Sequence, residues 1–589
     1  MGERPAAPAA AAAVLLAGLV AGVGVLGAAG RRASGVDPAR RIGHIVVIYE
    51  ENHSFDNLWG GWPGVDGLPD PSRRPPQVAQ DGRPLACLPQ DDVNLTSPPL
   101  TPVCTATLAD GTVVASHFPA RPFTIDDVIP ASATTCFPVT PEAPNGPPAG
   151  VVAGAGVPGG CTRDLAHDYY HEQYQLHGGR LDRYVTGSDA AGLAVGVYRT
   201  QDLPLYRYLH SPGAPRYAIA DHFFQAAFGG SFLNHQWLVA ARTPAWPGAD
   251  TSGTQDGCGR GPSRCDLHSV VDSEGMPGAT PLYRPDGTVR NNPLTEAAGP
   301  DGRCRPSYAG AVDPPPGTVC GDFAVNTIQP AFRPWAPGTV PARRLPPLTT
   351  ATIGDRLTAA GRSWAWYGGG WANAAGVTTS AGWTNGPGPA CADPQARADS
   401  SYPYCPDTRF QFHHQPFDYF AAFGDDTPEH RAMRAAHLKD EADFLADLRH
   451  GRLPAVAFVK PLGTENEHPG YGSQQAGDRH AVDLIRAIEA DAADWPSTVV
   501  VLTYDEFGGQ ADHVAPPATL PRADRWGPGT RIPALLVSPL LPASGGVDHT
   551  TYDTTSILAT IERRYGLAPL SERDQAVADF LPLFRRRGR

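Results

Sequence analysis

Two short apolar runs, far apart in the chain, constrain the fold more than any other feature. Residues 44–49 (HIVVIY) lead directly into the motif EENHSFD, and residues 498–504 (TVVVLTY) lead directly into DEFGG. Short β-branched runs without polar alternation are typical of strands buried on both faces of a parallel sheet. In open α/β sheets the ligand site lies just past the carboxyl ends of the strands. Carboxylates delivered to that edge from two strands predict a site for a hard cation.

Strands and helices alternate through the last part of the chain, which favours a doubly wound α/β sheet. An earlier helix is expected to begin at Ser231, with this serine as its N-cap. The other expected elements are strands at 42–49, 216–224, 453–459, 498–503 and 532–538 and helices at 168–176, 352–357, 430–449, 477–491 and 556–565.

Three loop-rich insertions are expected in this sheet, because Gly (65) and Pro (63) are abundant and cluster between the apolar runs. They cover about 62–160, 244–345 and 372–408. The ten cysteines fall as five pairs of sequence neighbours, and we expect local bridges within the loops, although sequence does not fix connectivity. The expected pairs are Cys87 with Cys104, Cys136 with Cys161, Cys258 with Cys265, Cys304 with Cys320, and Cys391 with Cys405.

The first 35 residues differ from the rest of the chain and predict export. Ala9 to Gly30 is almost unbroken apolar sequence, which fits a signal peptide, or alternatively an uncleaved N-terminal anchor. An even number of cysteines fits an oxidising compartment, so we expect a secreted or cell-envelope protein. The net charge is −13 and no basic block is present, so no nucleic-acid partner is expected.

Ser231 follows Gly229 and Gly230 at the expected start of a helix. Free amides and the helix dipole at such a position stabilise an anion, such as a phosphate or a serine alkoxide. The alternative is that Ser231 only caps the helix. The segment does not match Gly-x-Ser-x-Gly, so a nucleophile elbow is not indicated.

Four histidines are candidates for contacts with substrate or for proton transfer: His167, His413, His414 and His468. His468 ranks first because it follows a predicted strand end. If His413 and His414 lie in a strand, their side chains face opposite sides and only one points inward. The alternative for each is an ordinary structural hydrogen bond.

Taken together, these motifs resemble the bacterial phosphoesterase family that contains secreted acid phosphatases and phospholipases C. The resemblance runs from His44 onward, with the insertions least matched, and the family usually has Arg where this chain has His53. The motifs that carry it are EENHSFD at 50–56, GGRLD at 178–182 after His167, ADHFF at 220–224, FGGSFLNHQ at 228–236, SWAWY at 363–367, HHQPF at 413–417, EHPGY at 467–471, YDEFGG at 504–509, DHVAPP at 512–517 and IPA at 532–534.

The resemblance implies an alkaline-phosphatase-like α/β fold, with a central, mostly parallel sheet flanked by helices, in a phosphoesterase domain covering 36–589. It also implies one divalent metal ion of the calcium, magnesium or manganese class. The metal ligands would be Glu51, Asn52, Ser231, Asp505 and Glu506.

The same resemblance implies that Ser231 is the nucleophile. It assigns phosphate contacts or acid/base roles to His167, His413, His414 and His468, with Asn52 also binding substrate. The segment GGSFLNH at 229–235 is similar to the acid phosphatase branch, whereas the phospholipase branch typically has Thr after Gly-Pro.

The expected activity is therefore that of a secreted, metal-dependent acid phosphatase that hydrolyses phosphomonoesters through a phosphoseryl intermediate. The nearest alternative is a phospholipase C-type phosphodiesterase acting on phospholipid head groups. The expected partner is a small phosphoester, with membrane proximity through the N-terminal segment or a lipid substrate as the alternative. An inactive scaffold and a sulfatase are further alternatives, but no Cys-x-Pro-x-Arg segment is present for a sulfatase.

Overall fold

The structure is a computed structural model that describes most of residues 38–585. The segments outside the description within this range are 71–73, 79–81, 89–99, 108–112, 137–155, 166, 168, 189–190, 246–292, 295–322, 325–328, 337–338, 340, 342–343, 390, 392–400, 471, 519–522 and 525. The predicted leader therefore lies outside the described residues, as do two of the five expected cysteine pairs, Cys258 with Cys265 and Cys304 with Cys320.

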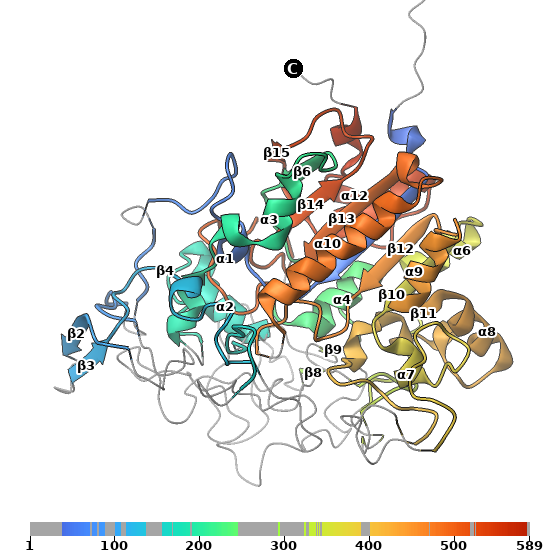
Figure 1. Cartoon of the computed structure of the whole chain (residues 1–589), viewed down its shortest axis with the longest axis horizontal. Coiled ribbons are helices and arrows are strands. Elements are labelled where there is room, and N and C mark those ends of the chain that lie inside the picture. The colour runs from blue at the N-terminus through green and yellow to red at the C-terminus, as the bar shows by residue number, and fades with distance from the viewer. Residues whose placement is uncertain are drawn as a thin grey trace, which may run out of the picture. The chain divides into compact units, whose positions relative to one another are not determined.

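An eight-stranded sheet forms the centre of the fold (Figure 1). All neighbouring strands are parallel except β14, which runs antiparallel to both of its neighbours. This confirms the predicted fold class, an α/β fold with a central, mostly parallel sheet flanked by helices. In spatial order the strands are β11 (Leu438–Asp440), β10 (Trp364–Gly368), β12 (Val456–Lys460), β1 (His44–Glu50), β13 (Thr498–Tyr504), β14 (Ala534–Val537), β6 (Tyr217–Ala220) and β15 (Gly546–Asp548).

The two apolar runs that opened the sequence argument are adjacent central strands. Strand β1 pairs in parallel with β13, with Glu50 opposite Tyr504, so both acidic motifs leave the sheet at the same edge. Every residue of β13 is buried, and every residue of β1 after His44 is buried. Burial on both faces explains why neither run alternates with polar residues.

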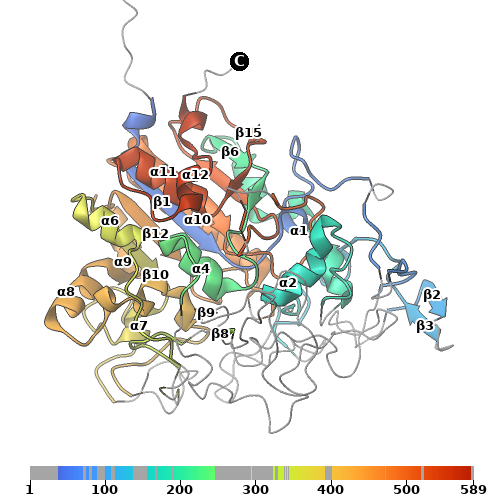
Figure 2. The ribbon, with the colours of Figure 1, turned by 180° about the vertical axis from the view of Figure 1, so that it is seen from behind.

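Helices cover both faces of the sheet. In Figure 1 the long helix α10 (Gln474–Ala490) crosses in front of the strands, together with α9 (Glu441–Arg449) and α3 (Pro204–Leu209). Figure 2 shows the opposite face, covered by α4 (Ser231–Ala240), α11 (Thr555–Tyr565), α12 (Glu572–Ala576) and α6 (Ile353–Ala359). The other helices are α1 (Phe55–Leu58), α2 (Tyr169–Leu176), α7 (Trp371–Ala375) and α8 (Pro428–His437).

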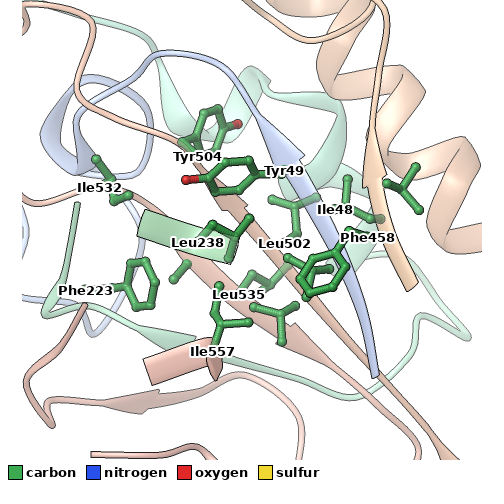
Figure 3. Packing of buried hydrophobic residues seen from close by; sticks show 14 of the residues in the cluster. Ile48, Tyr49, Phe223, Leu238, Phe458, Leu502, Tyr504, Ile532, Leu535 and Ile557 are labelled. Atoms are coloured by element: carbon green, nitrogen blue, oxygen red, sulfur yellow. The ribbon is translucent and has the colours of Figure 1, made fainter. Parts of the chain in front are cut away.

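The core on the α4 face packs helix side chains against the strands (Figure 3). Leu238 of α4 and Ile557 of α11 lie among Leu502 and Leu535, and all four are at most 1% exposed. This packing holds the amino end of α4 against the carboxyl ends of β1 and β13, which positions the site described below.

The single helix expected over 430–449 is wrong. The structure has helix α8, then strand β11, then helix α9. The side chain of Asp440 caps α9 in a reciprocal capping box with Asp443, while Leu438 pairs with Trp366 of the sheet. Helical spacing on both sides concealed the break, because a short strand between two helices carries little periodic signal.

Short two-stranded pairs lie outside the main sheet. They are β2 (Cys104–Thr107) with β3 (Val113–Ser116), β4 (Phe123–Thr124) with β5 (Gly196–Val197), β7 (Phe223–Phe224) with β16 (Tyr552–Asp553), and β8 (Pro293–Leu294) with β9 (Phe323–Ala324). The expected strand over 216–224 is thus divided between β6 of the main sheet and β7.

Three disulfides expected from sequence spacing are present: Cys87–Cys104, Cys136–Cys161 and Cys391–Cys405. Among the described residues, no helix has the length and apolar character needed to cross a membrane. The insertion boundaries and the extent of the phosphoesterase domain stay predictions.

Candidate active site

Glu51 is the centre of a buried cluster at the carboxyl edge of the sheet. It follows β1 directly, and its amide donates to the carbonyl of Asn466 at 2.9 Å. Its carboxylate accepts a hydrogen bond from the Ser231 hydroxyl at 3.1 Å. The same side chain lies 2.5 Å from Lys460 Nζ and 2.9 Å from His414 Nε2. Three distant parts of the chain therefore converge on one fully buried carboxylate.

Ser231 is the first residue of α4, and its hydroxyl does not cap the helix. The N-cap is Gly230, which corrects the expected serine cap. Gly229 has φ +90°, a left-handed conformation that favours glycine, and its amide donates to the carboxylate of Glu172 at 2.6 Å. The turn therefore holds Ser231 at a helix start while its hydroxyl is directed at Glu51.

Asp505 and Glu506 complete the acidic cluster from β13. The amide of Asp505 donates to the carbonyl of Glu50 at 3.1 Å, and the amide of Glu506 donates to Asp505 Oδ1 at 2.8 Å. Asp505 Oδ2 lies 3.8 Å from His235 Nδ1, within the same cluster. The convergence that the two acidic motifs predict is therefore what the structure shows.

Several oxygens of this cluster are buried without a hydrogen-bond donor, which fits a site for a cation. Asn52 Oδ1, Asp505 Oδ2 and Glu506 Oε1 have no hydrogen-bond partner in the described part of the chain. Leaving such oxygens unsatisfied is costly unless a cation or water coordinates them. Amide and carboxylate oxygens are the donor set that Mg²⁺, Ca²⁺ and Mn²⁺ prefer, so these residues fit a divalent metal ion.

The electrostatics of the carboxylates reflect this crowding. Burial raises the pKa of Asp505 well above its usual range, and the charges of Glu51 and Glu506 raise it further. Burial also raises the pKa of Glu506. For Glu51, burial acts upward, but His414 and Lys460 outweigh it and the pKa lies well below the usual range. Glu51 is therefore ionised. Asp505 and Glu506 require a nearby positive charge to be ionised as well.

His167 and His468 meet at the side chain of Asn52. The Asn52 amide nitrogen lies 2.9 Å from His468 Nε2 and 3.5 Å from His167 Nε2. His167 Nε2 is also 3.4 Å from Glu506, and His468 Nε2 is 3.8 Å from Glu51. His468 therefore lies near Glu51 Oε2, whereas His414 contacts Glu51 Oε1.

His413 and His414 both lie at the site, and the expected strand is absent. They belong to a 3-10 turn at Phe412–His414, in which consecutive side chains need not point to opposite faces. The ring of His413 lies 4.5 Å from that of His414. Within the described part of the chain, His413 Nδ1 is buried without a hydrogen-bond partner. Burial lowers the pKa of His414 to about 4 and lowers that of His413 well below its usual range.

Lys460 and His235 are part of the cluster, although sequence reasoning did not select them. Lys460 ends β12 and also donates to the carbonyl of Glu50 at 3.2 Å. Its rarity was an available signal, since the chain has only two lysines. His235 lies one helical turn after Ser231, donates from its Nδ1 to the Ser231 carbonyl at 2.7 Å and stacks on His414. Its spacing of four residues from Ser231 was the signal for a shared helix face.

Two groups of three side chains in this region offer ligand atoms close enough to hold a metal. The first is Glu51, His235 and His414, and the second is Asp164, His167 and His468, with the ligand atoms of each group within 4.8 Å of one another. Both groups border the acidic cluster. The number and identity of ions are not fixed by these groups.

Fold and site together define a class: α/β proteins with a buried cluster of carboxylate and histidine side chains at the carboxyl edge of a mostly parallel sheet. The chain belongs to the Phosphoesterase family, whose profile matches residues 42–568. The match covers the sheet, the acidic motifs, Ser231 and all four predicted histidines.

Curated relatives in the comparison are named as phospholipases C. The chain is 34% identical over 166 residues to phospholipase C B of Mycobacterium tuberculosis, which covers 24% of this chain and 31% of the relative. It is 29% identical over 165 residues to non-specific phospholipase C6 of Arabidopsis thaliana, covering 23% of this chain and 31% of the relative. The matches thus span less than a third of these relatives.

Solved structures with partial similarity include enzymes of two kinds. A phosphonate monoester hydrolase of Agrobacterium radiobacter has a TM-score of 0.22 and 13% identity, covering 41% of this chain and 63% of that one. A sulfatase from Pseudoalteromonas sp. has a TM-score of 0.16 and 14% identity, covering 24% of this chain and 31% of that one.

Proposed function

We propose that this protein is a metal-dependent phosphomonoesterase of the acid phosphatase kind, with Ser231 as its nucleophile. The observation that carries the proposal is the contact between the Ser231 hydroxyl and Glu51 at 3.1 Å, inside a buried cluster that also contains Asp505. A serine hydroxyl needs activation to act as a nucleophile, and buried carboxylates with a bound metal are one route.

Glu51, Asn52, Asp505, Glu506 and Ser231 are the residues we propose to hold the metal. When bound, a single divalent ion of the magnesium, calcium or manganese class would lower the pKa of the serine hydroxyl and stabilise negative charge on the phosphoryl oxygens. The unsatisfied oxygens of Asn52, Asp505 and Glu506 support this assignment.

The protein's own groups suit an in-line displacement at phosphorus. The Ser231 oxygen forms the new P–O bond while the bond to the alcohol breaks, and the hydroxyl proton passes to a neighbouring base. His468 or His167 donates a proton to the departing alcohol oxygen. Water then attacks the phosphoserine, the P–O bond to Ser231 breaks, and the serine regains a proton as phosphate leaves. The amino end of α4 favours the negative charge throughout.

His413, His414 and Lys460 line the other side of the cluster and are proposed to contact the phosphoryl oxygens or to orient Glu51. Lys460 supplies a positive charge at 2.5 Å from Glu51. Positive groups fixed around the transferred phosphoryl group stabilise the charge that develops in the transition state.

The choice of monoesters rests on the segment GGSFLNH at 229–235, which is similar to the acid phosphatase branch. The second candidate function is phospholipase C activity, because the curated relatives above carry that name. Both activities would use the same nucleophile and the same metal-binding residues. The two activities would differ in the part of the site that binds the alcohol of a phosphomonoester or the phosphorylated head group of a phospholipid.

Export is proposed together with this function. The apolar leader supports it, and so do the three disulfides, because such bonds persist in oxidising compartments. A secreted or cell-envelope location would give the site access to extracellular phosphoesters or to lipid surfaces.

A phosphoester panel with purified protein and added divalent metal tests the proposal. We expect release of p-nitrophenol from p-nitrophenyl phosphate to exceed release of phosphocholine from phosphatidylcholine, and the reverse order would select the second candidate. Ser231→Ala should lower kcat by at least about 10³-fold. The exposed Ser211→Ala is the matched control and should leave kcat unchanged. Activity of Ser231→Ala within a few-fold of the parent would reject the nucleophile.

A further inference from the structure

A small pocket opens beside the catalytic cluster on the side of Lys460 and His414. Both of these residues line it, together with the glutamine that follows the His pair, Gln415. Apolar walls come from Trp371, Phe410 and Leu462. Since Lys460 and His414 each contact Glu51, the pocket lies directly next to the proposed site of reaction.

Gln415 has an unusual environment for a glutamine. Its side chain is 1% exposed, and neither its amide nitrogen nor its amide oxygen has a hydrogen-bond partner among the described residues. A buried amide normally uses both groups, because leaving them unpaired loses the hydrogen bonds they make with water. Gln415 therefore has a donor and an acceptor that the folded chain itself does not satisfy.

A second unpaired donor lies near Gly368, a glycine that also lines the pocket. Trp366 Nε1 is buried and has no hydrogen-bond partner among the described segments. A Cβ placed on Gly368 would lie 3.6 Å from Trp366 Nε1 and 3.9 Å from Gln415 Nε2. The absence of a side chain at Gly368 therefore keeps space beside both donors.

The unpaired amide of Gln415 determines which chemical group of a ligand the pocket can bind. A partner that satisfies both ends of the Gln415 amide must accept one hydrogen bond and donate another. A neutral hydroxyl does both, whereas a methyl group does neither and a carboxylate only accepts. The enclosed space is about 10 Å³, which is the room that one water oxygen needs, so a single hydroxyl fits and a bulky group does not.

We propose that Gln415 binds a hydroxyl group on the alcohol portion of the substrate, so that the enzyme prefers phosphate monoesters of small hydroxylated alcohols. The inference rests on the proposed phosphomonoesterase function and specifies its substrate class. The carbon next to the bound hydroxyl packs against Trp371, Phe410 and Leu462.

This arrangement makes Gln415 a specificity residue with a measurable signature. A site built to hydrogen-bond a substrate hydroxyl discriminates against an analogue without it, because the buried polar groups are then left unpaired. A purely structural glutamine would instead contribute to folding stability and would treat both substrates alike.

The test compares two substrates that differ by one group, 2-hydroxyethyl phosphate and n-propyl phosphate, in which a methyl replaces the hydroxyl. For the parent protein we expect kcat/KM to be at least about tenfold higher for the hydroxylated ester. Gln415→Met keeps the side-chain volume and removes both hydrogen-bonding groups. It should bring the ratio close to one, mainly by lowering kcat/KM for 2-hydroxyethyl phosphate, with an unchanged or higher melting temperature.

Gln575→Leu, on the exposed face of α12, is the control and should keep the parent ratio. A parent ratio near one, or a parent-like ratio in Gln415→Met, would overturn the inference while leaving the phosphatase itself in place. A fall in melting temperature of Gln415→Met with no change in the ratio would show a structural glutamine. Absence of turnover on both esters and on p-nitrophenyl phosphate would reject the proposed function, and the inference with it.

Discussion

Glu50 and Glu51 are consecutive in sequence and equally buried, yet they have opposite environments. Glu51 contacts Ser231 at the start of α4, on the face that Figure 2 shows in front. Glu50 responds to the charges of His480, Glu441 and Asp478, which belong to α10 and α9 on the other face (Figure 1). The carboxyl end of β1 therefore delivers one acid to each side of the sheet.

The difference lies in the groups that contact each carboxylate directly. Glu51 contacts Lys460 and His414 directly, and its pKa is low. Burial raises the pKa of Glu50 to about 8, although the charges of Lys460 and His480 act to lower it. Neither carboxylate oxygen of Glu50 has a hydrogen-bond partner among the residues that the structure describes. The motif EENHSFD supplies two chemically equivalent acids, Glu50 and Glu51. Their neighbours in the folded protein determine that Glu51 is the one that is ionised in the active-site cluster.

The largest expected effect separates the two acids by activity. Glu51→Gln should lower kcat on p-nitrophenyl phosphate by about 10²–10³-fold, because it removes a negative ligand that contacts the nucleophile. Glu50→Gln should change kcat by less than about threefold, because its side chain faces the other side of the sheet. Steady-state kinetics at saturating metal measure both.

Thermal unfolding of the same two variants provides the folding control. Glu50→Gln should be at least as stable as the parent at pH 8, since it replaces a buried, unpartnered carboxyl group with a neutral one. Equal losses of activity in both variants would remove the functional distinction between the two faces of β1.

Metal removal is the second test. Dialysis against a chelator should abolish activity, and re-addition of Mg²⁺, Ca²⁺ or Mn²⁺ should restore it. Without the cation, the negative charges of Asp505, Glu506 and Glu51 repel one another with no bound positive charge to offset them. The melting temperature should therefore fall as well. Glu51→Gln should show a smaller change in melting temperature on chelation than the parent. Full activity in protein shown by elemental analysis to be metal-free would contradict the metal assignment.

Much of this arrangement could be predicted from the sequence. The apolar runs of β1 and β13 identified buried parallel strands, and the rule that ligand sites lie at the carboxyl edge predicted that their acidic motifs meet there. Ser231 and the histidines were candidates from the residues themselves, and the resemblance to a family supplied their expected roles. Spacing alone could not have placed His167 or His413, since each is brought to the site by loops.

Other parts depend on tertiary contacts that leave no local signal. Lys460 was not selected from the sequence, because its contact with Glu51 arises only when β12 lies beside β1 in the folded sheet. Which of Glu50 and Glu51 faces α4 depends on where β1 ends. The strand that interrupts residues 430–449 forms because Leu438 pairs with β10, a partner distant in sequence.

Lys460 offers a further test of the comparison between Glu50 and Glu51, because it contacts both residues. Its ammonium group contacts the Glu51 side chain and the Glu50 carbonyl. Lys460→Met should lower kcat/KM by about 10–10²-fold, since it removes a fixed positive charge from the transition state. Lys439→Met, at the other lysine of the chain and half-buried, is the control. A parent-like kcat/KM in Lys460→Met would assign this lysine to folding alone.

The smallest effect concerns stability on the α10 face. Burial alone would lower the pKa of His480, but Glu441, Glu465 and Glu50 raise it to about 9. A histidine with a raised folded pKa stabilises the protein fully below its unfolded pKa of about 6.5 and loses this contribution as pH rises through about 9. His480→Gln should therefore destabilise the protein by about 1–3 kcal/mol at pH 6 and by progressively less toward pH 10.

Urea unfolding at several pH values measures this effect. His450→Gln, an exposed histidine at the end of α9, is the control and should show little pH-dependent difference from the parent. A destabilisation by His480→Gln that stays constant from pH 6 to pH 10 would show that the charge of His480 is not what stabilises this face.

The central claim is that Ser231 attacks phosphorus within the cluster around Glu51 and Asp505. Acid quenching during turnover, followed by peptide mass spectrometry, tests it most directly. We expect one phosphorylated peptide that contains phosphoserine at position 231, absent from Ser231→Ala and strongly reduced in Glu51→Gln. Turnover at the parental rate with the phosphoryl group on a different residue would contradict the account.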